Sequence, residues 1–507
     1  MSGRIINSQV AGIDLGTTFT EATYWDDVGT PKPIPDLDGH LKTPSVVYVS
    51  KGAKEILVGV SALSMLFLEP ERTFIEFKRD VGTDKIYLSA NGNDITPSWC
   101  QYKLLEYLRL SGTKFFGDKR AASKAVITVP AYFGEKERQS VMKSAELAGI
   151  EVIMLINEPT AAALAFGISE KQGENLICVP DFGGGTFDVS VIQCSGGKID
   201  VIGSSGDKYL GGKDVDKKIT DMVQEKFMAE HNIEVSSVTC APEWYGIWEE
   251  VIRQKHMLSS KNEVKIIARA MGKQVVLELS RDQLNKAVSP LMERIKALTF
   301  QLLKDISVSE KDITGVLPIG GSSRLSAFKD CLKEMFGEQK IIGGRVSPDM
   351  AVAEGAIIKA IKEITSKGDS LVNENLQAIP APSIEVSDVM PHSLGVAVQD
   401  RVTDAKFCSV ILEKNTLIPC RVSRMYGSVA NDQKEFSIIV VQGEDNQPIE
   451  DCLIVGKKQL TLPNRGIDQK SIEITIGYDK SGMVDVCVHD LISNKVENIT
   501  IDFYQKK

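Results

Sequence analysis

Two glycine-containing turns, far apart in the sequence, carry the same kinds of polar residue. The first reads Asp14-Leu-Gly-Thr-Thr and the second reads Asp181-Phe-Gly-Gly-Gly-Thr, and each follows an apolar run. Glycine lets backbone N–H groups approach an anion without a Cβ in the way, and threonine hydroxyls add further donors. Because a carboxylate beside a phosphate is repulsive unless a cation lies between them, these turns indicate a phosphate site with a bridging Mg²⁺.

The two turns form a weak internal repeat of strand, acid, glycine turn and strand. A duplicated αβ unit would place them face to face across a cleft. One such turn alone is most often an ordinary hairpin, but two copies in this order favour a nucleotide site. The expected phosphate-lining residues are Gly16, Thr17, Thr18, Gly183, Gly184, Gly185 and Thr186, and the expected metal acids are Asp14 and Asp181.

A third glycine turn follows an apolar strand in the segment VLPIGGSSRL, residues 316–325. Gly320 and Gly321 lead into a helix that is predicted to begin near Ser322. Helix N-termini and glycine backbones bind anions or ribose hydroxyls. An ordinary strand–helix turn is the simpler interpretation of this segment alone, so it gains weight only as the third member of the set.

The elements that must position these turns alternate between strands and helices up to about residue 365. KAVITVPAYF predicts a strand that ends at Pro130, and GEKERQSVMKSAELAGI predicts a helix closed by Gly149. Residues 366–383 are polar, include two prolines and are interpreted as a linker or an exposed domain end. From residue 384 onward the apolar residues alternate with period two, as in SIEITIGYDKSGMVDVCVHD, where the DKSG segment is interpreted only as a hairpin turn.

The domain organisation follows from this change of pattern. We expect a nucleotide-binding domain over residues 1–365, a linker region over 366–388 and an antiparallel β-sandwich over 389–507.

The composition and charge of the chain argue against several classes of function. The chain has 507 residues with 59 Lys and Arg against 68 Asp and Glu, and this net charge of −9 argues against a general nucleic-acid or anionic-membrane binder. It has no run of 18 apolar residues and no apolar signal-peptide core at its N-terminus, so we expect a cytoplasmic protein. With five histidines far apart in sequence, a zinc site is not expected.

The nine cysteines are scattered without CxxC pairs, and Cys178, Cys408, Cys452 and Cys487 lie in apolar, strand-like runs. We interpret them as buried free thiols in a reducing compartment.

These segments carry a family resemblance. IDLGTT, ITVPAYF, INEPTAAALAFG, DFGGGTFDVSV, GDKYLGGKDVD, IGGSSR and SPDMAVAEGA occur in the order and approximate spacing of the 70-kDa heat-shock chaperone family. The resemblance extends from about residue 10 to the end of the chain. It implies an α/β, actin-like (ribonuclease-H-like) nucleotide-binding domain of two lobes, followed by an all-β sandwich that binds peptide. ITVPAYF and INEPTAAALAFG distinguish the chain from actins and sugar kinases, which share the two-lobed cleft.

The resemblance also implies roles for individual residues. Lys78 would orient the attacking water, and Glu158, Asp181 and Thr186 would complete the hydrolytic site. Asp14 and Asp181 would hold Mg²⁺ through water, and Pro130 and Arg138 would relay the nucleotide state between domains. The nucleoside side would be Lys255, Ser259, Gly320, Gly321, Ser322, Arg324 and Asp349, and the peptide pocket would be Val396, Val429, Phe436 and Ile438.

Several positions depart from the family pattern around the nucleotide and its partners. Lys213 stands where an acid is usual, and Ile252 and His256 replace a charged pair position, so we expect weaker nucleotide binding. Met154 replaces an arginine that the family offers to J-domain partners. Contacts with J-domain proteins and exchange factors are therefore doubtful. In the linker, Ile384-Glu-Val-Ser-Asp is more polar than the usual leucine-rich run, which predicts weaker interdomain coupling.

The sandwich departs from the family in two ways. Phe436 replaces a smaller aliphatic residue at the centre of the peptide pocket, and its ring either plugs the pocket or is accommodated by a backbone shift. No helical region follows the strands, so we expect a lidless site that releases peptide quickly.

The leading hypothesis is an ATP-dependent chaperone, a slow ATPase that binds unfolded polypeptide. The alternative is a regulatory, weakly or non-hydrolysing ATP-binding partner subunit of another chaperone or of the ribosome.

Overall fold

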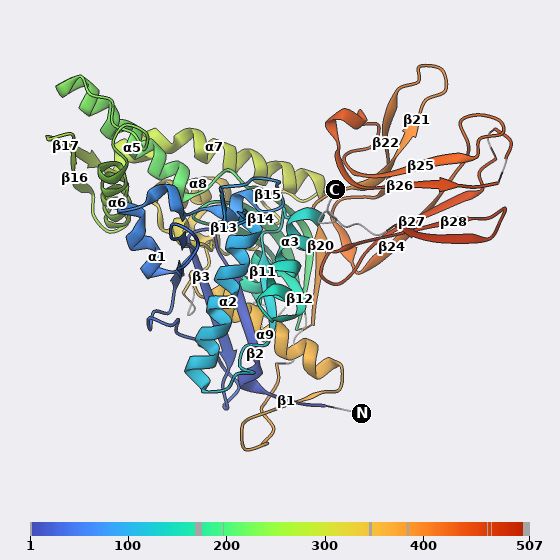
Figure 1. Ribbon diagram of the computed structural model, residues 1–507, viewed down its shortest axis with the longest axis horizontal. Helices are drawn as coiled ribbons and strands as arrows, with labels where there is room; N and C mark the ends of the chain where they lie inside the picture. The colour runs from blue at the N-terminus through green and yellow to red at the C-terminus, as the bar shows by residue number, and fades with distance from the viewer. Residues whose placement is uncertain are drawn as a thin grey trace.

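The computed structural model is a mixed α/β body with a pair of β-sheets at one end (Figure 1). It describes residues 3–167, 175–195, 197–343, 347–382, 385–463, 465–467 and 469–499.

The first sheet of the body carries the turn at Asp14. Its strand order is β12-β11-β2-β3-β4, with β5 pairing with β3. β2 and β3 are antiparallel, whereas β11 runs parallel to both β2 and β12. Its strands are β2 (Val10–Leu15), β3 (Phe19–Trp25), β4 (Pro31–Pro33), β5 (Thr43–Pro44), β11 (Lys124–Val129) and β12 (Glu151–Asn157). Helices α2 (Pro97–Phe116) and α3 (Glu135–Leu147) share a hydrophobic core with this sheet.

The second sheet repeats the strand–turn–strand unit at Asp181. Its order is β18-β13-β14-β15-β20-β23, and β13 and β14 are antiparallel around the turn. Its strands are β13 (Asn175–Phe182), β14 (Phe187–Ser195), β15 (Lys198–Asp207), β18 (Gly315–Val316), β20 (Glu385–Met390) and β23 (Thr416–Ile418). The matching hairpins confirm that the repeat seen in the sequence is a repeat of structure.

Helices on the second half of the body form their own hydrophobic core with this sheet. They are α5 (Gly212–His231), α6 (Ala241–Leu258), α7 (Arg281–Asp305) and α8 (Ser326–Phe336), with the hairpin of β16 (Glu263–Ala270) and β17 (Lys273–Ser280). The third glycine turn leads first into a 3₁₀ turn (Gly321–Arg324), so the α-helix begins at Ser326, four residues after the predicted start near Ser322.

Two helices connect the sheets. α4 (Glu158–Ala165) and α9 (Ala351–Ser366) pack on each other, and one core includes side chains of both helices and of both sheets. Gly355 allows this close crossing, because a Cβ added there would lie 1.6 Å from the carbonyl oxygen of Ala161.

Smaller elements complete the body. They are the parallel pair β1 (Arg4–Ile6) and β19 (Ser370–Val372), the strands β6 (Val47–Val49), β7 (Ile56–Val58), β8 (Thr73–Phe74), β9 (Leu88–Ala90) and β10 (Asn93–Ile95), and helix α1 (Val60–Ser64). The segment interpreted as a linker therefore contains two strands. β19 pairs with the N-terminal strand, and β20 pairs in parallel with β15 and continues past residue 388.

The C-terminal residues form two four-stranded sheets that share one hydrophobic core. One has the order β22-β21-β25-β26 and the other β24-β27-β28-β29, and neighbouring strands in both are antiparallel. The strands are β21 (Leu394–Gln399), β22 (Lys406–Leu412), β24 (Cys420–Tyr426), β25 (Glu435–Gln442), β26 (Leu453–Thr461), β27 (Ile472–Tyr478), β28 (Val484–Asp490) and β29 (Lys495–Ile499). The predicted hairpin is β27–β28.

The nine cysteines are free thiols. Cys178 and Cys408 are buried as predicted, but Cys452 and Cys487 are only half-buried, because both lie on strands or loops at the sandwich surface. Within the described part of the chain, no helix combines the length and apolarity needed to cross a bilayer.

Candidate functional site

One cavity of about 590 Å³ collects the residues that the sequence predicted for nucleotide binding. Of that predicted set, all members except Gly185 line it. The acids, threonines and glycines of the two repeated turns contribute one part of the wall. The third glycine turn and helix α6 contribute another.

The two phosphate-type turns pack directly against each other. A Cβ added to Gly184 would lie 2.0 Å from Thr18 Oγ1, and one added to Gly185 would lie 2.4 Å from Thr17 Cγ2. Larger residues would therefore separate the turns. Gly185 lies off the cavity wall, and its carbonyl oxygen accepts a 2.8 Å hydrogen bond from Arg79 Nε.

Lys78 and Glu158 form a buried ion pair on the cavity wall. Lys78 Nζ lies 2.7 Å from Glu158 Oε1, and their side chains are 5% and 8% exposed. Lys78 belongs to a 3₁₀ turn (Phe77–Asp80), and Glu158 is the first residue of α4, where the helix dipole favours an acid. The structure thus brings together two residues that are 80 positions apart in sequence.

The remaining acids of the cavity repel one another. Burial, followed by the negative charge of Glu158, raises the pKa of Asp14 to about 7, although Lys78 and a 2.9 Å hydrogen bond from Thr128 act in the opposite direction. Burial and the neighbouring acids also raise the pKa of Asp181 well above its ordinary value.

Asp188 belongs to the same group of acids. It lies opposite Asp181 in the β13–β14 ladder, and burial and Glu158 raise its pKa. One of its carboxylate oxygens, Oδ2, is buried without a hydrogen-bond partner among the described residues. Buried acids in excess of cations are the donor set that a hard divalent cation prefers, so these residues fit Mg²⁺.

The other end of the cavity is held by contacts between the third glycine turn, α5 and α6. Ser322 Oγ donates to the carbonyl oxygen of Gly183 at 2.8 Å. Lys255 Nζ lies 2.6 Å from Asp216 Oδ1. Arg324 donates to Asp349 at 2.8 Å, and Ser259 Oγ donates to the carbonyl oxygen of His256 at 2.6 Å.

Comparison with known proteins decides the family. A sequence model described as "Hsp70 protein" matches residues 10–506. The proteins named "Chaperone protein DnaK" from Thermotoga neapolitana and Thermotoga maritima are each 33% identical to the chain over 501 residues, covering 97% of this chain and 80% of theirs.

The chain belongs to the Hsp70 family.

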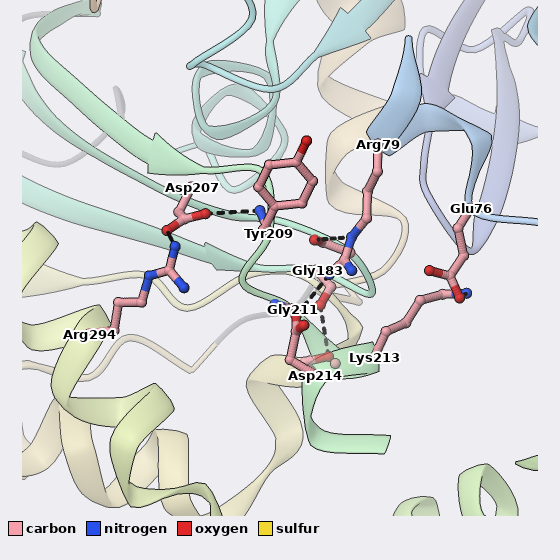
Figure 2. Close-up of polar contacts among 12 residues, drawn as sticks. Glu76, Arg79, Gly183, Asp207, Tyr209, Gly211, Lys213, Asp214 and Arg294 are labelled. Carbon is pink, nitrogen blue, oxygen red and sulfur yellow. Dashed lines mark hydrogen bonds and ion pairs between the residues drawn. The ribbon is translucent and has the colours of Figure 1, made fainter. Parts of the chain in front are cut away.

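Lys213, which departs from the usual Hsp70 pattern, has a compensating partner. Figure 2 shows Lys213 extending from the start of α5 toward Glu76, with which it forms an ion pair. Its ammonium group also lies 5.3 Å from the centroid of the Trp248 ring. Beside it, Arg79 donates to Asp214 at 2.8 Å (Figure 2). Ile252 and His256 line the cavity as well, and burial lowers the pKa of His256.

Arg138, predicted to couple the domains, is 1% exposed and contacts three different parts of this Hsp70 chain. It donates from Nε to the carbonyl oxygen of Phe133 at 3.0 Å, from Nη2 to Asn157 Oδ1 at 2.8 Å, and from Nη1 to the carbonyl oxygen of Ser481 at 3.0 Å. Pro130 is buried at the end of β11, where its carbonyl oxygen accepts from Phe133 N–H.

Asp388, on β20, joins the same network. Asn157 donates to its Oδ1 at 2.8 Å and Thr160 donates to its Oδ2 at 3.1 Å. Burial raises the pKa of Asp388, although Arg138 partly offsets the effect. Ile384, the first residue of the predicted linker motif, lies outside the described residues.

Three of the four predicted peptide-pocket residues lie in the sandwich core. Val396 on β21 and Phe436 and Ile438 on β25 are 2%, 5% and 8% exposed. Val429 is 36% exposed and lies outside that core. The guanidinium carbon of Arg465 lies 4.9 Å from the centroid of the Phe436 ring, so cation and ring together fill this part of the core. Met154, which was predicted to replace an arginine that contacts J-domain partners, is buried on β12.

Sequence reasoning missed four residues at these sites. Asp188 could have been found from the register of the DFGGGTFD hairpin. Glu21 could have been found as the one charged residue of the strand FTEATYW, and burial and Asp14 raise its pKa to about 8. Lys42 gave no signal in the sequence. Ser481 lies in the DKSG segment, which was interpreted only as a turn. Its Oγ accepts from Leu155 N–H at 3.2 Å, and its carbonyl oxygen accepts from Arg138.

Proposed function

We propose that this chain is an ATP-dependent chaperone of the Hsp70 type, a slow ATPase whose nucleotide state modulates polypeptide binding by the C-terminal sandwich. The observation that carries the proposal is the cavity itself, in which two packed glycine turns, paired acids and the Lys78–Glu158 ion pair share one wall. Family membership over residues 10–506 supports the same function. The corresponding architecture is an actin-like domain of two lobes followed by a β-sandwich.

In this proposal the chain's residues act by binding and orienting. Backbone N–H groups of the glycine turns and the hydroxyls of Thr17, Thr18 and Thr186 hold the phosphates. The Lys78 ammonium, fixed by Glu158, orients the attacking water near the γ-phosphate. Asp14 and Asp181 would hold Mg²⁺, which would supply charge neutralisation for the transferred phosphoryl group.

Little bond-making is required of the protein, so positioning and charge carry the rate. On that basis, loss of the Lys78 ammonium is expected to cost roughly 3 kcal/mol, about a hundredfold in the rate of hydrolysis.

In the regulatory alternative, the same cavity binds ATP but hydrolyses it weakly or not at all. It is favoured by the filled core around Phe436 and by the burial of Met154, and it is opposed by the intact Lys78–Glu158 pair. Partners in either case are unfolded polypeptide or a partner protein. The free thiols support a cytoplasmic location.

Measurement of ATP turnover by the purified full chain tests the proposal. Hydrolysis above background that requires Lys78 supports the ATPase, and Mg-ATP binding without turnover supports the regulatory subunit.

A further inference from the structure

Lys42 and Glu21 bring an additional charge pair into the nucleotide cavity, and neither residue belongs to the glycine turns or to the Lys78–Glu158 pair. Both line the cavity. Lys42 immediately precedes β5, which pairs with β3 at Thr20 and Thr43. Continuation of this antiparallel register places Lys42 opposite Glu21, so the sheet itself presents the two side chains together.

The position of Glu21 within the sheet places this pair beside the metal-binding acids. Glu21 is the direct cross-strand partner of Asp14 in the β2–β3 ladder. Cross-strand partners project from the same face of a sheet, so Glu21 and Asp14 face the cavity side by side.

Lys42 also reaches the nucleoside end. Its Nζ lies 2.7 Å from Asp349 Oδ2 and 3.5 Å from Glu21 Oε1. Asp349 in turn accepts from Arg324 of the third glycine turn. The ammonium group is therefore held between the acids beside Asp14 and the residues predicted to contact the nucleoside, which is where the phosphates of a bound nucleotide join its nucleoside.

The free bonding capacity of this group points to a ligand. The Glu21 side chain is 4% exposed, and its Oε2 has no hydrogen-bond partner among the described residues. Lys42 is still 36% exposed although it touches two carboxylates, and an ammonium group has three donors.

We propose that Lys42, held in the cavity by Glu21 and Asp349, is a further nucleotide-binding residue that contacts the phosphate chain of a bound nucleoside diphosphate or triphosphate. The inference rests on the proposed function of the cavity. It adds a second cation besides Lys78 on the phosphate side, and it assigns Glu21 as a positioning residue that keeps the ammonium group directed into the cavity.

The test is isothermal titration of the full-length chain and its variants with Mg-ADP, AMP and adenosine. Lys42→Met should weaken Mg-ADP binding by about ten- to hundredfold, the range for loss of one charge-assisted contact. The affinity of Lys42→Met for adenosine should stay within about twofold of that of the unmodified chain, because adenosine has no phosphate for Lys42 to contact. Lys42→Arg should restore most of the Mg-ADP affinity. Lys265→Met is the matched control, because Lys265 also pairs with a carboxylate but lies outside the cavity.

Folding of Lys42→Met is checked by thermal unfolding without nucleotide, and Asp349 retains Arg324 as its partner in this variant. Equal losses for Mg-ADP and adenosine, or no loss for either, would overturn the inference. Failure of the unmodified chain to bind Mg-ADP would instead overturn the proposed function. An effect on Mg-ADP but not on AMP supports a contact beyond the first phosphate.

Discussion

Single residues explain why the cavity fits a cation. Asp181 and Asp188 are buried and Asp14 is half-buried, and both desolvation and the charge of Glu158 raise the pKa of each of them. Within the described structure, Lys78 is the cation that lowers the pKa of all three. A divalent cation would neutralise charge that the protein leaves unbalanced.

The first prediction concerns Asp14→Asn without metal. A carboxyl group whose pKa is raised from 3.8 to about 7 stabilises the fold fully below pH 3.8, and this contribution is lost as the pH rises through 7. At pH 8 the buried charge is therefore unfavourable. Asn should raise the free energy of unfolding by about 1–3 kcal/mol in EDTA, measured by urea denaturation.

The control for that experiment is Asp84→Asn, since Asp84 is exposed on the loop after the 3₁₀ turn Phe77–Asp80 and lies outside the cavity. The same Asp14→Asn variant should lose the Mg²⁺ dependence of nucleotide binding. A destabilised variant at pH 8 would contradict the electrostatic account of the cavity.

The second prediction concerns Phe436→Val. Because the ring is 5% exposed and lies beneath Arg465, its removal should cost roughly 1–4 kcal/mol of stability, the range for large-to-small core changes. If the ring plugs the peptide pocket, affinity for an unfolded hydrophobic peptide should rise, as measured by fluorescence anisotropy. Unchanged peptide affinity in a folded variant would show that the ring does not block binding.

Residues that act through local motifs were predictable from the sequence, whereas those that act through distant pairing were not. Asp14 and Asp181 could be identified from the sequence because each one begins a glycine-containing turn. Glu21 and Lys42 become neighbours only through the register of β5 on β3. No local pattern encodes that register, so their role emerges only from the folded sheet.

At the scale of elements, β20 joins the body to the sandwich. It adds to the second sheet in parallel with β15, with Lys198 opposite Glu385 and Asp200 opposite Ser387. The polar character of this segment suggested weak docking. In the structure Ser387 Oγ donates to Asp200 Oδ1 at 2.6 Å, so a side-chain hydrogen bond and backbone pairing hold the strand.

The third prediction is that Asp388→Ala releases β20 from the body. Removal of the carboxylate takes an acceptor from Asn157 Nδ2 and from Thr160 Oγ1, and it removes the largest of the negative charges that offset the buried Arg138 guanidinium. Loss of one member of such a buried network costs about 3–5 kcal/mol. Limited proteolysis should then cleave within residues 366–388 much faster than in the unmodified chain.

Asp451→Ala, which removes an exposed acid from the 3₁₀ turn Ile449–Asp451 of the sandwich, is the control for proteolysis. Equal cleavage rates in Asp388→Ala and the unmodified chain would show that the carboxylate does not hold the strand.

Elements with strong periodicity were predictable, and those defined by pairing partners were not. The alternation of residues 472–488 identified the β27–β28 hairpin directly. Residues 366–388 looked like a linker because much of the segment is polar, it includes two prolines and it shows no strong periodicity. Each forms a strand by pairing with another strand that lies far away in sequence: β19 pairs with β1, and β20 pairs with β15. The local sequence does not reveal such a partner.

At the scale of the whole molecule, the sandwich is hydrogen-bonded to α3 and β12 of the body and forms an ion pair with the end of α7. Glu135 accepts from Val484 N–H at 2.7 Å, and Lys414 pairs with Asp305 at 2.7 Å. Tyr132 connects the two regions, because its N–H donates to Asp188 at 3.3 Å and its carbonyl oxygen lies 2.7 Å from His392 Nε2. One residue therefore touches both an acid of the nucleotide site and the sandwich.

The fourth prediction concerns the pH dependence of this interface. Burial raises the pKa of Glu135 from 4.5 to about 7. Its contribution to docking is therefore complete below pH 4.5 and lost as the pH rises through 7. Glu135→Gln keeps an acceptor for Val484 and removes the charge. This variant should strengthen docking at pH 8 by at most about 3 kcal/mol, measured by energy transfer between labels on body and sandwich.

His392 has the opposite effect on the pH dependence of docking. Burial lowers its pKa, so protonation of His392 weakens docking as the pH falls below its ordinary pKa of 6.5. His392 is present in both the unmodified chain and the Glu135→Gln variant. The difference in docking free energy between these two proteins therefore reports on Glu135 alone. A difference that does not change between pH 5 and pH 8 would contradict the prediction.

The most direct test of the account is single-turnover hydrolysis of Mg-ATP by the full chain beside Lys78→Ala. Lys103→Ala is the control, since Lys103 pairs with Glu106 on α2 and lies outside the cavity. The account predicts slow hydrolysis by the unmodified chain and the control, and a rate at least about a hundredfold lower in Lys78→Ala with ATP still bound. Tight ATP binding without turnover in the unmodified chain, or turnover unaffected by Lys78→Ala, would contradict it.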